Sequence, residues 1–503
     1  MRIGRGGNGN ESATPETPGV APTPEAAGAP GTPPGAPAVS AATGVSAQGL
    51  TSAARRLVPG VRLGPLPRVA PRRLPLPGRV IRRPRIRIRR AAPLLAVLGP
   101  GLIAGIAGND AGGITTYSVL GARTGYTLLW LFPITIVVLA VVQEMAARLG
   151  TVTGQGLSDL IRDWFGVRWT AFAMLVLLVA NLANTVAEFA GASAALEIFG
   201  VSRLITVPVL AVALWGVVVF ASYRRLERLF LLISLVFVTY IAAAYLARPD
   251  GSQIAAGLTH PSLSVAGVPM LQVLLLAVAL VGTTITPYMQ FYLQSAVAEK
   301  GIVEEELGYE RADAILGSVW TNVIAVCIVV ATAATLFGAG VALTDAAQAA
   351  EALRPVAGDL STGLFGAGLF GASVLAAMIM PISTAFVICE AFGWESGVGK
   401  PVRDAPAFFG LFTFVLVAGA VVTLVPGLDL IGLIVSSQYL QGLLLPVVLV
   451  FMVLLVNNRR LMGRHANGRG LNLVAIVSVG LVILLDVALL GASALQAVGI
   501  HLD

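Results

Sequence analysis

The sequence is poor in charge, cysteine and histidine. Only 12% of its 503 residues are Asp, Glu, Lys or Arg, whereas 56% are hydrophobic, and a soluble protein of this length needs far more charge to cover its surface. Cys327 and Cys389 each lie inside an apolar run, which indicates buried structural cysteines and excludes a disulfide framework. The histidines His260, His465 and His501 fall in predicted loops or the tail. Because the apolar region holds no nucleophile–base pair and no His-rich site, the sequence does not indicate an enzyme, and no cofactor is expected.

Long apolar runs are what the sequence has in abundance. From residue 93 onward, runs of 18 or more apolar residues recur, and each is long enough to cross ~30 Å of hydrocarbon as a helix. Continuous runs of this kind indicate helices, because barrel strands are shorter and alternate in polarity. We expect an all-α polytopic membrane protein with eleven membrane segments, at about 93–118, 127–147, 170–198, 204–222, 229–247, 268–297, 313–337, 362–391, 406–425, 429–456 and 471–499.

The basic residues are concentrated at the N-terminus. Residues 1–54 are rich in Pro, Ala, Gly, Ser and Thr, a composition that predicts a disordered low-complexity tail. Residues 55–90 carry thirteen Arg directly before the first apolar run, which predicts a juxtamembrane segment on anionic lipid. This asymmetry argues against a nucleic-acid-binding domain. We expect residues 91–503 to form one eleven-helix membrane domain.

The loop charges predict an orientation. If the basic tail is cytoplasmic, the loops on its side of the membrane hold fourteen Lys or Arg, and the loops on the other side hold four. Positive charge accumulates on the cytoplasmic side of membrane proteins. We therefore expect a multi-pass protein of the plasma (inner) membrane, with the N-terminus inside and, after eleven segments, the C-terminus outside.

Two segments contain features that interrupt a helix. In the first, Asp110 lies near the middle of the span and is followed by Gly112 and Gly113. An ionised aspartate at this depth costs ~2.5–3.5 kcal/mol, and the paired glycines favour unwinding that exposes backbone carbonyls. In the sixth, Pro287 lies mid-span and removes a helical hydrogen bond. A carboxylate beside free carbonyls is typical of a cation site.

The two interruptions are five segments apart. This spacing predicts an inverted five-plus-five repeat, with repeat one at about 93–247, repeat two at about 268–456 and an extra helix at 471–499. In such transporters the substrate binds near the midplane, between the broken helices. Three threonines flank the break in segment six and could supply oxygen ligands, namely Thr283, Thr284 and Thr286.

At these residues the chain resembles the NRAMP family of divalent-metal transporters. Short matches follow one another in family order over residues 93–463. They include Gly99-Pro100-Gly101, Asp110-Ala111-Gly112-Gly113, Gly121-Ala122-Arg123-Thr124-Gly125-Tyr126, Arg148-Leu149-Gly150-Thr151, Ala187-Glu188-Phe189, Ser437-Gln438 and Asn458-Arg459-Arg460-Leu461-Met462-Gly463. The resemblance implies the LeuT-like fold with helices one and six broken at the midplane, and a divalent metal ion as the transported substrate.

The chain departs from the family pattern at the metal ligands. The family's metal-binding Asn falls on Gly113, and its segment-six Ala, Met and His fall on Thr283, Thr286 and Tyr288, or the His near Met289 in a shifted register. These substitutions are similar to those of the divergent NRAMP-related magnesium transporters. The segment-three acidic residue three positions before Glu188 is likewise replaced, by Thr185.

The substitutions change the chemistry that the resemblance implies. A Met thioether favours soft ions, whereas carboxylate, carbonyl, hydroxyl and amide oxygens suit Mg²⁺ and Mn²⁺. We expect a hydrated, all-oxygen metal site formed by Asp110, Gly113, Thr283, Thr286 and Gln438. The resulting prediction is import of Mg²⁺, and of Mn²⁺ with it, by alternating access.

Most of the side chains that the family uses for proton coupling are absent from this sequence. The family's proton route uses a segment-six His and acidic residues of segment three, and of these only Glu188 remains. Glu188, Thr185, Tyr288 and Met289 are therefore candidates for proton or gating roles, and we expect transport without proton coupling. The alternatives are a proton-coupled Mn²⁺/Fe²⁺ importer, an amino-acid transporter of the same fold and a non-transporting sensor. The sequence leaves the oligomeric state and the role of Asp486 undetermined.

Overall fold

The computed structural model describes residues 105, 108–220, 238–337 and 360–497. Apart from an isolated bridge between Val265 and Val268, the regular structure in these residues is helical. The long helices are α3 (Ala111–Thr124), α4 (Leu131–Thr153), α6 (Val167–Glu197), α7 (Arg203–Phe220), α11 (Met270–Thr284), α12 (Pro287–Lys300), α13 (Leu307–Leu336), α16 (Leu360–Phe392), α17 (Pro406–Thr423), α18 (Leu430–Val456) and α20 (Arg469–Ala497). The short ones are α5 (Leu157–Phe165), α9 (Val238–Leu246), α10 (Gly251–Thr259), η2 (Glu304–Glu306), α19 (Arg459–Met462) and η4 (Gly463–His465).

The predicted membrane segments correspond to these helices. Within the described residues, nine helical spans are long and apolar enough to cross a membrane, with α11 and α12 counted as one. Two further predicted segments, 93–118 and 229–247, lie partly outside the described residues, which contain their later parts as α3 and α9. The predictions for 1–54 and 55–90 lie wholly outside them. The short helices α5 and α10 were not predicted, because each is too brief to stand out as an apolar run.

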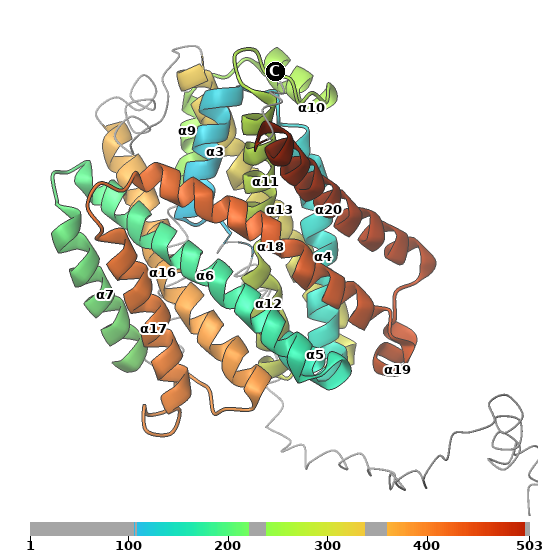
Figure 1. Ribbon diagram of the computed structural model, residues 1–503. Coiled ribbons are helices and arrows are strands. Elements are labelled where there is room, and N and C mark those ends of the chain that lie inside the picture. The colour runs from blue at the N-terminus through green and yellow to red at the C-terminus, as the bar shows by residue number, and fades with distance from the viewer. Residues whose placement is uncertain (1–104, 106–107, 221–237, 338–359, 498–503) are drawn as a thin grey trace, which may run out of the picture. The chain divides into compact units, whose positions relative to one another are not determined.

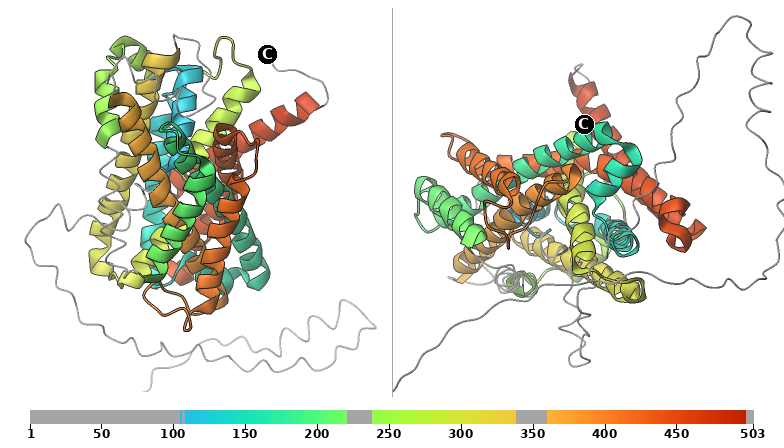
Figure 2. Two further views of the ribbon diagram at one scale, coloured as in Figure 1. Left: turned by 90° about the vertical axis from the view of Figure 1, so that its left-hand side faces the viewer. Right: turned by 90° about the horizontal axis from the view of Figure 1, so that it is seen from below.

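Two groups of helices pack around the start of α3. In the first, α6 lies along α16, α17 and α18; in the second, α13 lies along α3 and α4. α18 crosses between the groups and contacts α6, α3 and α11, and α20 packs on α11 and α18 (Figure 1). Seen from the side, most of the long helices run in the same general direction, as a membrane-spanning bundle requires (Figure 2).

The break in segment six lies where the sequence predicts it. α11 ends at Thr284 and α12 begins with Pro287 at its first position. A proline suits that position because the first helical N–H has no intrahelical partner. Pro287 also has no N–H to give to the carbonyl of Thr283, four residues before it. The last turn of α11 therefore ends with carbonyl groups that α12 does not satisfy.

The break in segment one differs from the prediction. Gly112 and Gly113 are not unwound but form the first turn of α3, and the non-helical residues Gly108, Asn109 and Asp110 precede them. The reason is that Asp110 is the N-cap of α3: its extended backbone stops the helix, and its side chain accepts a hydrogen bond from Gly113 N. The two glycines instead allow neighbouring groups, among them the Gln438 amide and Thr283 Oγ1, to lie close to the α3 backbone.

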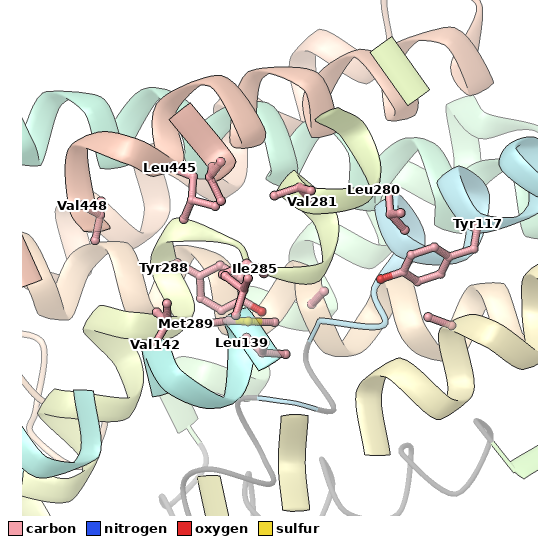
Figure 3. Packing of buried hydrophobic residues seen from close by; sticks show 14 of the residues in the cluster. Tyr117, Leu139, Val142, Leu280, Val281, Ile285, Tyr288, Met289, Leu445 and Val448 are labelled. Atoms are coloured by element: carbon pink, nitrogen blue, oxygen red, sulfur yellow. The ribbon is translucent and has the colours of Figure 1, made fainter. Parts of the chain in front are cut away.

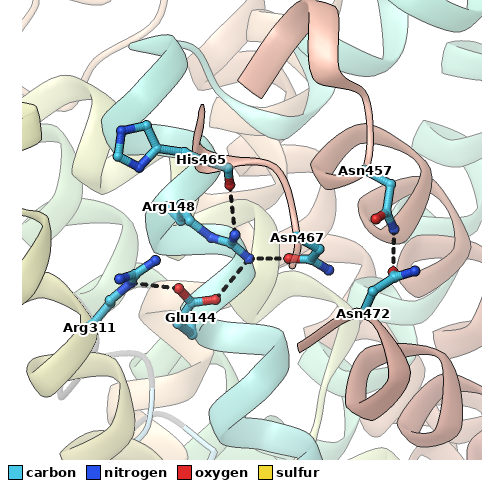
Figure 4. A network of polar contacts seen from close by, with 7 residues as sticks. All are labelled: Glu144, Arg148, Arg311, Asn457, His465, Asn467 and Asn472. Carbon is cyan, nitrogen blue, oxygen red and sulfur yellow. Dashed lines mark hydrogen bonds and ion pairs between the residues drawn. The ribbon is translucent and has the colours of Figure 1, made fainter. Parts of the chain in front are cut away.

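A buried arginine joins the ends of several helices away from this break (Figure 4). Arg148 on α4 donates to Glu144 Oε2 at 3.0 Å, to Asn467 Oδ1 at 2.5 Å and to His465 O at 2.7 Å. Arg311 on α13 donates to the other oxygen of Glu144 at 2.7 Å. Glu144 thus pairs with two arginines, Arg148 one turn away on its own helix and Arg311 on α13. His465 lies in this loop and His260 ends α10, so neither is in a membrane span.

Candidate functional site

Asp110 begins the site, at the point where the chain enters α3. Its carboxyl is 1% exposed, yet its hydrogen-bond donors are neutral: Gly113 N gives one to Oδ1 at 2.7 Å, and Asn184 Nδ2 gives one to Oδ2 at 2.9 Å. The aspartate lies at the N-terminus of α3, where the helix dipole favours negative charge. Its position is therefore set by its own helix on one side and by α6 on the other.

Glu188 on α6 places a second carboxyl beside the first. It is 0% exposed, and its Oε2 accepts a hydrogen bond of 3.1 Å from Ala111 N, the residue that follows Asp110. The Glu188 and Asp110 carboxyl groups also lie close enough to interact directly. Within the described part of the chain, neither carboxyl forms an ion pair with a Lys, Arg or His. Burial of two acidic groups without a basic partner is expensive unless a cation or a proton offsets the charge.

A chain of two amides connects the aspartate with α18. Gln438 Nε2 donates to Asn184 Oδ1 at 2.6 Å, and Asn184 in turn donates to Asp110. Gln438 Nε2 also donates to Ser437 Oγ at 2.8 Å. A Cβ atom on Gly112 would collide with the Gln438 amide, so this glycine allows α18 to approach the start of α3. These hydrogen bonds connect α3, α6 and α18, which correspond to the first, third and tenth predicted membrane segments.

Gly113 faces a cluster of oxygen atoms. A Cβ built on it would lie 2.9 Å from Gly108 O, 3.3 Å from Thr283 Oγ1 and 3.4 Å from Asp110 Oδ1. These oxygens come from the two broken helices, and they surround the space that a larger side chain at this position would fill. The structure thus brings together Asp110, Gly113 and Thr283, with Gln438 attached through Asn184.

The remaining candidates from segment six lie at or just after the break (Figure 3). Thr286 is the N-cap of α12, with an extended backbone and a fully buried side chain. Tyr288 and Met289, in the first turn of α12, are also fully buried. The Tyr288 hydroxyl interacts electrostatically with the carboxyl groups of Asp110 and Glu188. The Met289 methyl group contacts Gly108.

Thr185 is not brought into the site. Its hydroxyl donates to Asn181 O of its own helix at 2.7 Å, and its methyl group faces Gly419 on α17. The residue next to it, Asn184, contacts Asp110 instead. Sequence reasoning missed Asn184, although it lies four residues before Glu188 and hence on the same helix face.

Several buried polar atoms around the carboxyls lack a hydrogen-bond partner. Among the described residues these include both polar atoms of Asn109, Oε1 of Glu188, Oγ1 of Thr283 and Oε1 of Gln438. Buried polar groups are almost always hydrogen-bonded in proteins, so such a group requires an explanation, such as a role in binding an ion or water. Four of the five atoms are oxygens that can accept from water. Asn109 was also missed, although it directly precedes Asp110.

Comparisons with known proteins agree with the resemblance. The family described as "Natural resistance-associated macrophage protein-like" matches residues 101–492. A divalent metal cation transporter of Aeromonas hydrophila is 27% identical over 413 residues, which cover 79% of this chain and 96% of the relative. The family match includes both broken helices and ends within α20.

Solved structures show the same fold. The manganese transporter of Eremococcus coleocola has a TM-score of 0.61 at 24% identity, covering 78% of this chain and 86% of its own. The transporter MhsT, crystallised with L-phenylalanine, has a TM-score of 0.55 at 16% identity, covering 79% and 99%. The fold is the LeuT-like inverted repeat. With the family match over most of its length, this chain belongs to the NRAMP family and is a multi-pass divalent-metal transporter.

Proposed function

We propose that this transporter imports Mg²⁺, and Mn²⁺ with it, through a site centred on Asp110 in which the ion keeps part of its water. The observation that carries the proposal is the buried pair of Asp110 and Glu188, which has no basic partner among the described residues. The pair attracts a cation, and the oxygens of Thr283 and Gly108 beside Gly113 are hard ligands of the kind that Mg²⁺ and Mn²⁺ prefer.

The unpartnered acceptors support a hydrated ion. Magnesium dehydrates reluctantly and keeps several waters in protein sites. Each water bound to a cation points its hydrogens outward and so needs acceptors around it. Oxygen atoms of Asn109, Glu188, Thr283 and Gln438 are buried acceptors without a donor among the described residues. Of these, Thr283 Oγ1 lies beside Gly113 together with Asp110 Oδ1. Gly113 lets the oxygens of Gly108 and Thr283 approach its Cα more closely than an asparagine would allow.

The membrane potential is sufficient to drive uptake. A divalent cation that enters a cell at −100 mV gains roughly 4.6 kcal/mol, at ~2.3 kcal/mol per charge. That free energy supports a gradient of roughly 2000-fold. A proton gradient is therefore not needed for Mg²⁺, and the described membrane spans contain no histidine.

The proposed orientation follows the basic residues. We infer that the N-terminus lies in the cytoplasm, that residues 55–90 rest on the anionic lipid of the plasma (inner) membrane and that the C-terminus lies outside. The asymmetry of Lys and Arg between the loops supports this orientation.

One observation favours the alternative of a proton-coupled Mn²⁺/Fe²⁺ importer. The Glu188 carboxyl lies beside that of Asp110, and its Oε1 has no partner among the described residues. Two carboxyls in contact can share one proton, which metal binding would displace. The two functions differ in whether metal entry changes the pH of the compartment that receives it.

The test is flux into proteoliposomes that contain the full chain, at zero pH gradient and with an inside-negative potential. Saturable Mg²⁺ entry that Asp110→Asn abolishes is the expected result. Asp486→Asn is the matched control, because Asp486 is also a buried membrane carboxyl but lies on α20, outside the site. Mn²⁺ entry that requires a pH gradient, without Mg²⁺ entry, would establish the proton-coupled alternative. Competition by amino acids would point to an organic solute, and absence of any flux would point to a sensor.

A further inference from the structure

A thioether lies on the α16 side of Asp110, where the sequence gave no reason to expect one. Met380 is fully buried on α16, and its Sδ lies 3.5 Å from Asn184 Nδ2. The same nitrogen donates to Asp110 Oδ2 at 2.9 Å. One amide nitrogen thus connects a carboxylate oxygen with a sulfur, on the face of Asp110 that is turned toward α6 and α16.

The Asn184 NH₂ group occupies a position that suits a cation. A carboxylate accepts hydrogen bonds and does not donate them, so Asn184 must present its nitrogen to Asp110. Its oxygen must then face Gln438, which the 2.6 Å contact confirms. The NH₂ group carries partial positive charge and lies between two electron-pair donors, one hard and one soft.

Rotation of the Asn184 amide would turn this position into a set of ligands. The terminal torsion of asparagine is broad and roughly two-fold, so the amide has a second orientation in which Nδ2 and Oδ1 are exchanged. After the exchange Oδ1 would face Asp110, and Nδ2 would face Gln438. Gln438 has an acceptor ready for it, because its Oε1 has no partner among the described residues. The two amides can therefore reverse the direction of their hydrogen bond.

We propose that Asp110, Asn184 and Met380 form a second, softer metal position in the site, which takes ions such as Fe²⁺ or Cd²⁺. The inference rests on the proposed function, because both positions share Asp110. Compared with the family pattern, this chain lacks the amide ligand at Gly113 and the thioether ligand at Thr286. The structure has both donor types on the other side of the aspartate, supplied by α6 and α16.

The two positions differ in the ions they favour. A thioether is a soft, polarisable ligand that adds affinity for Cd²⁺ and Fe²⁺ and contributes little to Mg²⁺. Mg²⁺ would remain on the oxygen side, at Gly108, Gly113 and Thr283, with its water. A soft ion would lose water and move toward Met380. The Asp110 carboxylate thus binds both hard and soft ions. Met380 determines how strongly soft ions compete with Mg²⁺ for that carboxylate.

The test is Cd²⁺ binding to the purified full chain, measured by calorimetry and by X-ray absorption at the cadmium edge. The background carries Cys327→Ser and Cys389→Ala, so that cysteine sulfur cannot contribute a cadmium–sulfur signal. Met380→Leu is the variant, since Met and Leu have similar volumes. Met378→Leu is the matched control, because Met378 is equally buried on the same helix but packs in a separate apolar cluster with Phe408 and Phe412.

The expected result is a cadmium–sulfur signal in the parent that Met380→Leu removes, together with about a tenfold loss of Cd²⁺ affinity. Met378→Leu should behave as the parent in both measurements. A parent spectrum with oxygen ligands only, or a sulfur signal that survives Met380→Leu, would overturn the inference. Failure of the proposed function looks different: Asp110→Asn would then leave Mg²⁺ flux intact.

Discussion

Asn184 Nδ2 lies 2.9 Å from Asp110 Oδ2 and so fixes the rotation of α6 relative to the start of α3. Both side chains are buried, at most 1% exposed. A hydrogen bond to a charged group is shorter and stronger than a neutral one. The aspartate therefore faces the interior of the bundle in a defined orientation, and the predictions below depend on that orientation.

Gly113→Ala should impair transport by filling the space between the broken helices. The new Cβ would lie 2.9 Å from Gly108 O and 3.3 Å from Thr283 Oγ1, which forces those oxygens outward. We expect a higher KM for Mg²⁺ in the liposome assay, since the ligands would no longer close on the ion. Gly480→Ala on α20 meets open space and is the control. An unchanged KM in Gly113→Ala would show that the ion does not use this space.

Asn109→Leu should separate stability from transport. Both polar atoms of Asn109 are buried without a partner among the described residues, so their removal should leave the Tm unchanged or raise it. If Asn109 holds the water of the ion, the Mg²⁺ flux should fall roughly tenfold. Ser118→Ala is the control, since Ser118 Oγ is likewise buried without a partner among the described residues but lies nine residues further along. Equal flux in both variants would exclude a role for Asn109.

Glu188→Gln should preserve transport of Mg²⁺ while weakening its affinity. The glutamine oxygen can still accept from Ala111 N, which keeps the contact between α6 and α3. The loss of one negative charge beside Asp110 should raise the KM. A pH dye in the lumen should show no change during Mg²⁺ entry in the parent or the variant. Acidification in the parent that disappears in Glu188→Gln would instead establish proton coupling through this residue.

Arg148→Met should destabilise the protein more than Arg311→Gln does. The Arg148 side chain is 2% exposed and joins Glu144 with the loop of His465 and Asn467, whereas the Arg311 side chain is 42% exposed. Breaking a buried ion pair costs about 3 kcal/mol, and breaking a half-exposed one costs about 1 kcal/mol or less. Thermal unfolding of the purified variants measures the difference. Equal losses of Tm would mean that the loop contacts contribute nothing.

The sequence predicts the parts of the site that depend on covalent structure. Pro287 has no N–H, so α12 had to begin there, and Asp110 within an apolar run had to be functional or paired. The position of the first break was misplaced by a few residues, because the sequence did not show that Asp110 would cap α3. Gly112 and Gly113 read as sources of flexibility, but in the structure they provide space for neighbours.

The partners contributed by other helices could not be predicted in this way. Each residue turns a helix by about 100°, so adjacent positions such as Asn184 and Thr185 face different neighbours. The family pattern directed attention to Thr185, whereas Asn184 reaches Asp110. Met380 lies 196 residues from Asn184, within a helix of mostly apolar residues. Its contact depends on the packing of α16 against α6, which no local pattern specifies.

The hydrogen bonds of Arg148 also affect how the chain is made. His465 and Asn467, which complete its hydrogen bonds, follow it by more than 300 residues. A ribosome adds about 5–20 residues per second, so the arginine waits for these two partners for roughly 15–60 seconds during synthesis. Glu144, one turn earlier on the same helix, leaves the ribosome before Arg148 and can neutralise it throughout that interval. The Glu144–Arg148 pair within α4 therefore compensates the arginine charge until His465 and Asn467 have been synthesised.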